Sequence, residues 1–112
     1  MRKNINENLR NEFLYLISYG PIKAELIRPN NGTPFLLYED IDEDFGIIFI
    51  DENMDIKHIS PVNIDSLLSD QYSTTGVEIY DSEKHVDVLI GMLRRAYTIY
   101  MENVEYLEKI RG

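Results

Sequence analysis

The chain has 112 residues, of which 20 are Asp or Glu and 11 are Lys or Arg, so its formal net charge is −9 at pH 7, and 44% of its residues are hydrophobic. This length predicts a single domain over residues 1–112, and this hydrophobic content excludes a chain that is disordered throughout. Because the chain has no Cys, disulfides, thiolate metal sites and cysteine nucleophiles are also excluded.

The N-terminal segment has the pattern of an amphipathic helix. Apolar residues recur three or four positions apart, at Leu9, Phe13, Leu16 and Ile17, and the Gly-Pro pair at 20–21 ends the pattern. We therefore expect a helix over residues 5–18.

Two β-hairpins are expected next. Residues 22–26 alternate between apolar and polar, P-N-N-G at 29–32 has turn composition, and residues 34–38 are apolar, which predicts the first hairpin. Residues 46–51 form an apolar strand that a tight turn joins to residues 55–59, which predicts the second.

The region after the hairpins has weaker patterns. Asn63 is expected to cap a short helix that continues through Leu67 and Leu68. Residues 72–76 are expected to form a loop, and the β-prone residues 77–80 an edge strand.

The C-terminal segment predicts a long amphipathic helix. Asp81 and Ser82 are candidate N-caps, and one apolar stripe follows at Val86, Leu89, Leu93, Ala96, Tyr97, Tyr100, Val104 and Leu107. Such a helix has about 25 residues and is about 38 Å long, which is longer than a small sheet needs. Either one end extends past the sheet and meets a partner, or the N-terminal helix covers it. The fold class is therefore α+β, with an antiparallel sheet of four to five strands packed against both helices.

Acidic residues are concentrated in the middle of the chain. Residues 38–55 contain eight Asp or Glu and no Lys or Arg, and residues 29–83 contain thirteen acids and one base, Lys57. Phosphate contact requires Lys and Arg, so direct binding of nucleic acid through this segment is not expected. The charge favours a basic protein partner instead.

A calcium loop is one interpretation of residues 40–51, because carboxylates alternate at Asp40, Asp42 and Asp44. Gly46 lies one position too late for an EF-hand, however, and Asp51 is too short to replace the bidentate Glu at position twelve. The flanking segments are also strand-like rather than helical. We therefore expect no specific metal site.

Catalytic motifs are absent from the sequence. There is no Gly-rich phosphate loop, nucleophile elbow or zinc-protease motif. His58 lies on a short strand near Asp55 and Ser60, where strand alternation gives no relay geometry, and we expect it to face solvent. His85 is expected at the surface in the first turn of the last helix. We expect no enzyme activity, no catalytic residues and no cofactor.

A binding surface is the alternative to plain solvated turns. Acids that border a sheet and its turns can form one spaced row of negative charge that imitates a phosphate backbone. The predicted partner-binding residues are Glu39, Asp40, Asp42, Glu43, Asp44, Phe45, Asp51, Glu52 and Asp55. Tyr38 and Phe45 flank the first acidic turn, and either is a candidate aromatic anchor. In the competing interpretation, these Asp and Asn residues only form turns.

Three motifs resemble the staphylococcal-type uracil-DNA glycosylase inhibitors, which are small acidic DNA mimics. They are I-D-E-N at 50–53 followed by Asp55, L-S-D-Q-Y at 68–72 and Y-T-I-Y at 97–100, although the order of these motifs along the chain differs from that family. The resemblance implies that acidic side chains fill the DNA-binding groove of the enzyme. It also implies that an apolar pocket receives the side chain that the enzyme would insert into the duplex. Asp51, Glu52 and Asp55 are the residues it implicates, with no cofactor.

The predicted function is therefore an acidic DNA-mimic inhibitor that occludes the basic groove of a DNA-acting enzyme, such as a uracil-DNA glycosylase or a host defence nuclease. Three alternatives are open: an immunity protein that neutralises a basic toxin nuclease, a regulatory module that dimerises through its Tyr-rich C-terminal helix, and a small hydrolase. Apolar runs such as that at 47–50 are far shorter than the roughly 20 residues of a membrane helix, and the N-terminus M-R-K-N-I-N-E-N lacks the apolar region of a secretory signal. We expect a cytoplasmic protein that binds no membrane.

Overall fold

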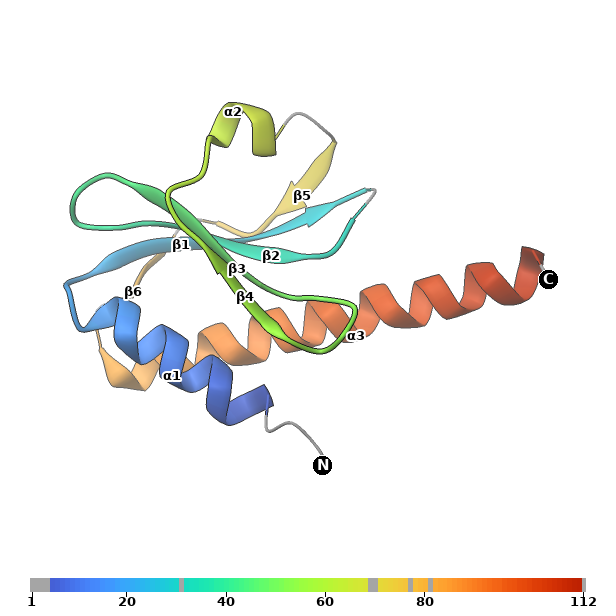
Figure 1. Ribbon diagram of the computed structural model, residues 1–112, viewed down its shortest axis with the longest axis horizontal. Coiled ribbons are helices and arrows are strands. Elements are labelled where there is room, and N and C mark those ends of the chain that lie inside the picture. The colour runs from blue at the N-terminus through green and yellow to red at the C-terminus, as the bar shows by residue number, and fades with distance from the viewer. Residues whose placement is uncertain (1–4, 31, 69–70, 77, 81, 112) are drawn as a thin grey trace.

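The computed structural model describes residues 5–30, 32–68, 71–76, 78–80 and 82–111. Along the chain the elements are α1 (Ile5–Ile17), β1 (Ile22–Pro29), β2 (Phe35–Glu39), β3 (Phe45–Ile50), β4 (Ile56–Ile59), α2 (Ile64–Leu67), β5 (Tyr72–Thr74), β6 (Glu78–Tyr80), the 3₁₀ turn η1 (Glu83–His85) and α3 (Val86–Arg111). Figure 1 shows this order from blue to red. The predicted α+β class, the N-terminal helix, both hairpins and the long C-terminal helix are confirmed.

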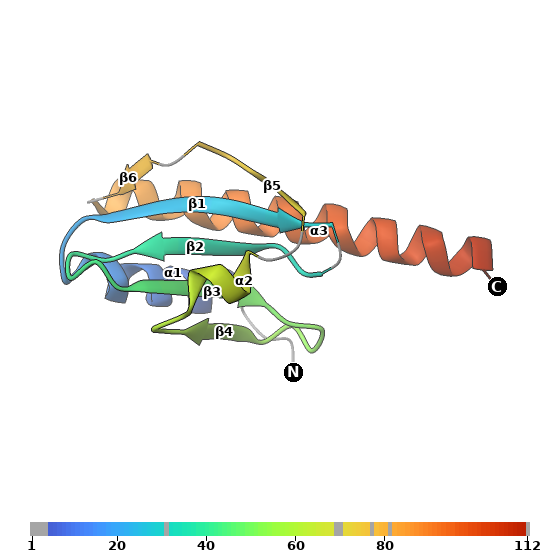
Figure 2. The same ribbon diagram turned by 90° about the horizontal axis from the view of Figure 1, so that it is seen from above.

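The strands form one antiparallel sheet in the order β4-β3-β2-β1-β5, with the short β6 also paired with β1. β1 has eight residues, so it accommodates β5 beside its last residues and β6 beside its first. The predicted edge strand is therefore present as β6, while Val77 lies outside the described residues. Figure 2 shows β1 and β2 lying side by side with β3 and β4 beyond them.

The loop predicted at 72–76 is wrong for its first three residues, which form β5. Their side chains are exposed and gave no apolar pattern. Hydrogen bonds hold this segment to β1: just after β5, Thr75 N donates to Leu26 O at 3.2 Å, and Leu26 N donates to the side-chain Oγ1 of Thr75 at 3.1 Å. β5 and Thr75 thus provide hydrogen-bond partners for backbone groups along the edge of β1 that would otherwise have none.

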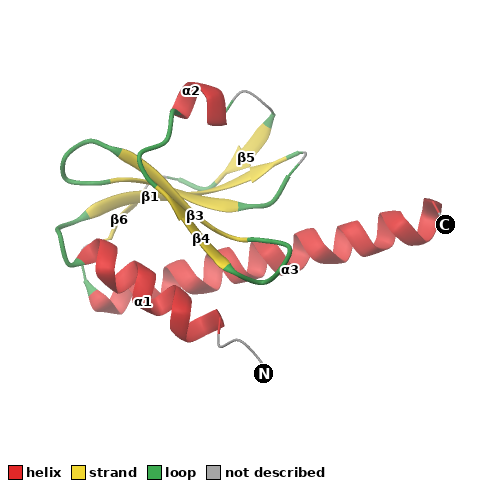
Figure 3. Cartoon of the chain, viewed as in Figure 1, coloured by secondary structure: helices red, strands yellow, loops and turns green. Residues whose placement is uncertain are grey.

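Both faces of the sheet carry apolar side chains, because helices cover one face and α2 with its flanking loop covers the other (Figure 3). The larger core joins α1 and α3 to one face, through Leu9, Phe13, Leu16, Leu26, Leu36, Tyr38, Ile48, Ile50, Leu89, Leu93 and Tyr97 among others. The smaller core lies on the opposite face and contains Ile27, Phe35, Leu37 and Ile47, with Val62, Leu67 and Leu68 packed on it. Because side chains alternate between the two faces along β1, β2 and β3, these strands contribute residues to both cores.

The predicted cap of the short helix is confirmed. The side chain of Asn63 accepts hydrogen bonds from the amides of Asp65 and Ser66, at 3.0 and 3.4 Å. Before the long helix, Ser82 stands at the N-cap of η1, and its hydroxyl is 3.4 Å from Nδ1 of His85, which is half-buried. Asp81, the other predicted cap, lies outside the described residues.

α3 has 26 residues, so it is about 39 Å long. α1 packs on its N-terminal half, where Arg10 pairs with Glu83 at 2.7 Å and with Asp87 at 2.8 Å. These ion pairs are exposed and contribute at most about 1 kcal/mol each, whereas fully burying a side chain such as Phe13 contributes about 1.5–3 kcal/mol. The two helices are therefore held together mainly by apolar packing.

The C-terminal half of α3 extends past the ends of β1 and β2 (Figures 1 and 2). Tyr106 and Ile110 are 64% and 63% exposed there. The predicted overhang is thus present, and the alternative in which the N-terminal helix covers it is wrong, because α1 lies at the other end of α3. Among the described residues, no helix has the length and apolar character needed to cross a membrane.

Candidate protein-binding site

The predicted single row of acids is wrong, because β3 separates the acids into two groups. Glu39, Asp40, Asp42, Glu43 and Asp44 lie at or in the β2–β3 turn, and Asp51, Glu52 and Asp55 lie in the β3–β4 turn. In an antiparallel sheet these turns stand at opposite ends of β3, a strand of six residues and about 17 Å in length. Figure 1 shows the two turns on opposite sides of the sheet. One flat surface therefore does not contain all the predicted residues.

The two acidic turns are built in the same way, with an Asp at the first position. Oδ1 of Asp40 accepts hydrogen bonds from the amides of Asp42 and Asp44 at 2.9 and 3.0 Å, and Oδ1 of Asp51 accepts them from the amides of Asn53 and Asp55 at 2.9 Å each. Asp side chains commonly stabilise turns through such bonds. The turn-forming interpretation thus describes Asp40 and Asp51 well.

The fourth position of each turn has a left-handed backbone. Glu43 and Met54 both have φ of 64°, and their amides donate to Asp40 O and Asp51 O at 3.1 and 3.0 Å. A residue other than Gly in this region is strained, so the bonds from each Asp carboxylate help to hold the turn closed. Both turns therefore present their remaining acids in a fixed geometry.

Asp51 has a second internal contact. Its Oδ2 lies 3.7 Å from Nζ of Lys57, and its side chain is only 18% exposed. Its charge is therefore less available to a partner than that of Glu52, which is exposed.

Replacing Asp51 by Ala is expected to lower the free energy of unfolding by about 1–2 kcal/mol, because two turn amides lose their acceptor. Asp51→Asn retains an oxygen that accepts both bonds, so it should lose less than half as much. Urea denaturation of the three proteins measures both values. Equal losses in Ala and Asn would show that the charge of Asp51, rather than its hydrogen bonds, stabilises the turn.

Phe45 and Tyr38, the two predicted aromatic anchors, are packed inward. Phe45 is half-buried against the smaller core, and Tyr38 is 3% exposed in the larger one. Two exposed rings, Tyr15 of α1 and Tyr19 just after it, stack edge to face at 5.1 Å. These two residues had no predicted role, because neither belongs to the apolar stripe of the N-terminal helix.

His58 was expected to face solvent, and this is wrong. Its Nδ1 is 3.3 Å from Oε2 of Glu12, its Nε2 is hydrogen-bonded to the hydroxyl of Tyr38, and its side chain is 23% exposed. Gly46 stands opposite Tyr38 in the sheet, and its lack of a side chain allows the Tyr38 ring to cross β3 toward His58. The result is a chain of polar groups from α1 through β4 to β2.

This polar chain has the connectivity of a catalytic relay but not its accessibility. Burial raises the pKa of Tyr38 above its usual value, against a smaller lowering by its hydrogen bond with Ser60. The phenol therefore stays protonated at neutral pH. The Tyr38 residue is almost fully buried, and the network joins α1 to the sheet.

A hollow of about 330 Å³ lies between α3 and the β3–β4 turn. Its lining consists of Ile5, Ile50, Met54, Arg94, Tyr97, Thr98, Met101, Glu102 and Glu105. The hydroxyl of Tyr97 donates to Asp51 O at 3.2 Å and lies 3.3 Å from Sδ of Met54, so it fixes the turn against the helix. Burial, and then the charge of Asp51, raise the pKa of Tyr97.

The rim of this hollow is acidic. Glu102 and Glu105 on α3 line it and are exposed, and Glu52, which precedes the lining residue Met54 by two positions in the β3–β4 turn, is exposed as well. The base in the lining, Arg94, donates a hydrogen bond to Asn6. We call the three carboxylates of Glu52, Glu102 and Glu105 the acidic rim.

Glu52 is among the predicted partner-binding residues, whereas Glu102 and Glu105 are not. They lie about 50 residues from the acidic turns, and only the packing of Tyr97 on the β3–β4 turn brings the two segments together. The available signal was the three-residue spacing of the two Glu residues, which places both on the polar side of the helix.

The β2–β3 turn has a different environment. Its Ile41 packs over Gly20 at the end of α1, with Ile41 Cδ1 3.1 Å from the position of an added Cβ. Lys23 lines a shallow hollow together with Glu39, Asp40 and Glu43, so a base is close to these acids. Lys23 stands directly opposite Glu39 in the sheet. The positive charge of Lys23 thus partly balances the negative charge of this turn.

Within the described residues, no group of three or more His, Asp or Glu side chains is arranged to hold a metal ion. Residues 69 and 70 of the L-S-D-Q-Y motif lie outside the described residues. No family model, curated protein or solved structure matches the chain. What the chain does must therefore be inferred from its own charges, hollows and contacts.

Proposed function

We propose that this chain is an acidic cytoplasmic binding protein that docks on the basic cleft of a nucleic-acid enzyme and blocks it. The acidic rim faces the cleft, and the hollow behind the rim receives an apolar side chain of the enzyme. A uracil-DNA glycosylase is the first candidate partner, because the β3–β4 turn carries the I-D-E-N motif at 50–53. The observation that carries the proposal is the pairing of an acidic rim with an apolar hollow.

Electrostatics favours this kind of partner. The chain has a net charge of −9, so a cationic surface is attracted over roughly a Debye length, about 8 Å at physiological ionic strength. Rim charges of this type act mainly on the rate of association and on specificity. We therefore expect binding that weakens steeply as salt is added.

The hollow supplies the short-range part of recognition. Met54 and Met101 line it, and their flexible thioethers adapt to an inserted side chain. Burying one Leu or Phe of a partner there contributes about 1.5–3 kcal/mol. In this proposal the acidic rim attracts the partner and the hollow holds an inserted apolar side chain. A solvated acidic turn alone would do only the first.

The test is competition between this protein and DNA. At low micromolar concentration the protein is expected to displace a fluorescent DNA duplex from uracil-DNA glycosylase, as measured by fluorescence anisotropy. The variant Glu52→Gln/Glu105→Gln should weaken this competition about fivefold or more, because each exposed charge contributes up to about 1 kcal/mol. Raising the salt should reduce the difference between the variant and the unmodified chain.

A matched control comes from the other acidic turn. Asp42→Asn/Glu43→Gln removes the same number of charges at the opposite end of β3, and competition should then change less than about twofold. If this control abolishes competition and the rim variant does not, the binding site has been assigned to the wrong turn. If the unmodified protein displaces no DNA, mimicry of DNA toward this enzyme is rejected.

A further inference from the structure

The overhanging part of α3 carries a wide apolar face. Ile99, Tyr106, Leu107 and Ile110 are between 44% and 64% exposed, and their positions recur at helical spacing. Among the described residues, α1 lies beside the N-terminal half of α3 (Figure 1), and its first residue, Ile5, lines the hollow behind the acidic rim together with Met101. An amphipathic helix normally buries such a face.

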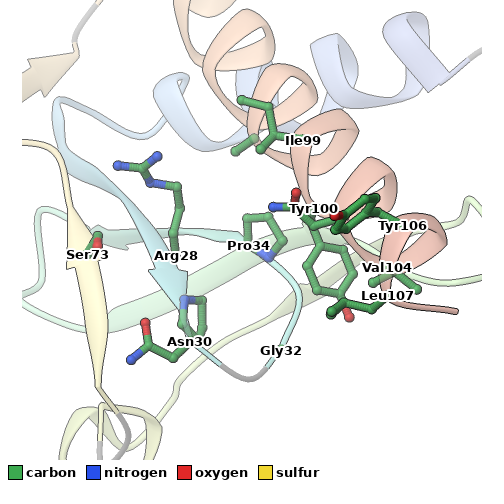
Figure 4. Close-up of a pocket in the computed structure, with 13 residues that line it drawn as sticks. Arg28, Asn30, Gly32, Pro34, Ser73, Ile99, Tyr100, Val104, Tyr106 and Leu107 are labelled. Atoms are coloured by element: carbon green, nitrogen blue, oxygen red, sulfur yellow. The ribbon is translucent and has the colours of Figure 1, made fainter. Parts of the chain in front are cut away.

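A groove of about 510 Å³ runs along this face. α3 forms one wall, and the β1–β2 end of the sheet forms the other, with Arg28, Asn30 and Pro34 on it. Figure 4 shows Tyr100, Val104 and Leu107 on the helix side, across from Pro34. The groove is separate from the hollow behind the acidic rim, and the two have no lining residue in common.

The charges beside the apolar face indicate what occupies it. Glu102 and Lys109 are seven residues apart, close to two helical turns, so they lie on the same edge of the face. If a second copy of the helix lies antiparallel, with the two-fold axis between residues 105 and 106, then each Glu102 stands opposite Lys109 of the other copy. In a parallel pair in register the two edges that carry Glu102 and Lys109 would lie on opposite sides of the interface, so these ion pairs would not form.

The same register also brings two sets of apolar residues to the same level, Val104 with Leu107 and Met101 with Ile110. Because the two-fold axis lies between residues 105 and 106, residues equally far from it on either side face one another. Val104 thus stands opposite Leu107 of the second copy. Antiparallel helices bring equivalent edges together, which lets both ion pairs form at once. The overhang of α3 is therefore complementary to itself in charge and in apolar character.

We propose that a second copy of this chain covers the groove, through an antiparallel pair of α3 segments at residues 99–110. Each helix contributes a strip about 18 Å long, which at a helix width of about 10 Å covers roughly 200 Å², well below the standard interface of about 800 Å² per partner. We therefore expect a weak dimer, with a dissociation constant in the micromolar range. Exposed ion pairs fix its direction, and the apolar face supplies most of its stability.

Sedimentation equilibrium between about 5 and 300 µM tests the dimer. The unmodified chain should change from monomer to dimer over this range. Leu107→Asp should raise the dissociation constant at least about tenfold, since it places a charge in the apolar face. Leu107 is half-exposed in the single chain, so this variant should retain its fold, which circular dichroism checks.

Charge exchange tests the direction of the pair. Glu102→Lys and Lys109→Glu should each weaken the dimer about threefold to tenfold, and the double variant should restore it to within about twofold. Asp42→Lys makes the same charge change in the distant β2–β3 turn and should have no such effect. Glu102 also belongs to the acidic rim, so these measurements use the chain alone.

A chain that stays monomeric throughout would overturn the proposal and leave the groove to a different protein. A dimer that persists in Leu107→Asp would overturn it as well, because the interface would then lie elsewhere. A double variant that stays as weak as the single ones would reject the antiparallel register.

Discussion

Replacing Gly46 by Ala is expected to lower the free energy of unfolding by about 2–4 kcal/mol, because no room exists for a methyl group at this position. A Cβ added to Gly46 would lie 2.8 Å from Cε1 of Tyr38 and closer still to its Cζ and hydroxyl oxygen. The Tyr38 ring would have to leave the space over β3, and its hydrogen bond to His58 would break. Urea denaturation measures the loss.

Gly91 is the matched control for this change. It lies inside α3, and a Cβ added there would meet no atom within 4 Å. Gly91→Ala should therefore raise the free energy of unfolding by about 0.5–1 kcal/mol, the usual gain in a helix interior. If Gly46→Ala were as harmless as Gly91→Ala, the position of Tyr38 across β3 would not matter for stability.

Long apolar periodicities made much of the fold predictable. The stripes that begin at Leu9 and at Val86 each bury one face of a helix, and the apolar strand at Phe45–Ile50 is covered on both sides. β5 was missed because Tyr72–Thr74 are exposed and pair with β1 through hydrogen bonds instead of apolar packing. Patterns of side chains do not report such a pairing.

The position of His58 was missed for a related reason. Strand alternation indicates which face a residue occupies, but not whether a neighbouring strand leaves a gap that another side chain crosses. Here the gap is Gly46, and the ring that crosses it belongs to Tyr38. A Gly inside an apolar strand was the available signal, since it often marks close approach of another group.

The acids of the site were predictable as turn residues but not as one surface. The repeated pattern Asp-x-x-x-Asp, at 40–44 and 51–55, was the signal for two turns of the same type. Charge counts along the sequence could not show that β3 holds these turns apart. Nor could they show that Glu102 and Glu105 join the second turn, because that contact depends on Tyr97 of α3.

Replacing Leu93 by Ala should lower the free energy of unfolding by about 2–5 kcal/mol, because Leu93 is fully buried between the sheet and the helices. The same change at Leu107, three to four turns later on α3, should cost less than about 1 kcal/mol in dilute solution, because that side chain is half-exposed in the overhang. Thermal or urea unfolding at about 1 µM compares the two, below the range in which the proposed dimer forms.

The same pair of variants separates folding from assembly on one helix. At about 200 µM the cost of Leu107→Ala should grow, since dimerisation adds to the apparent stability of the unmodified chain but less to that of the variant. The cost of Leu93→Ala should stay nearly constant with concentration. A Leu107→Ala penalty that is already large at 1 µM would mean that the overhang stabilises the single chain, and the apolar face of α3 would then have a role in folding instead of in docking.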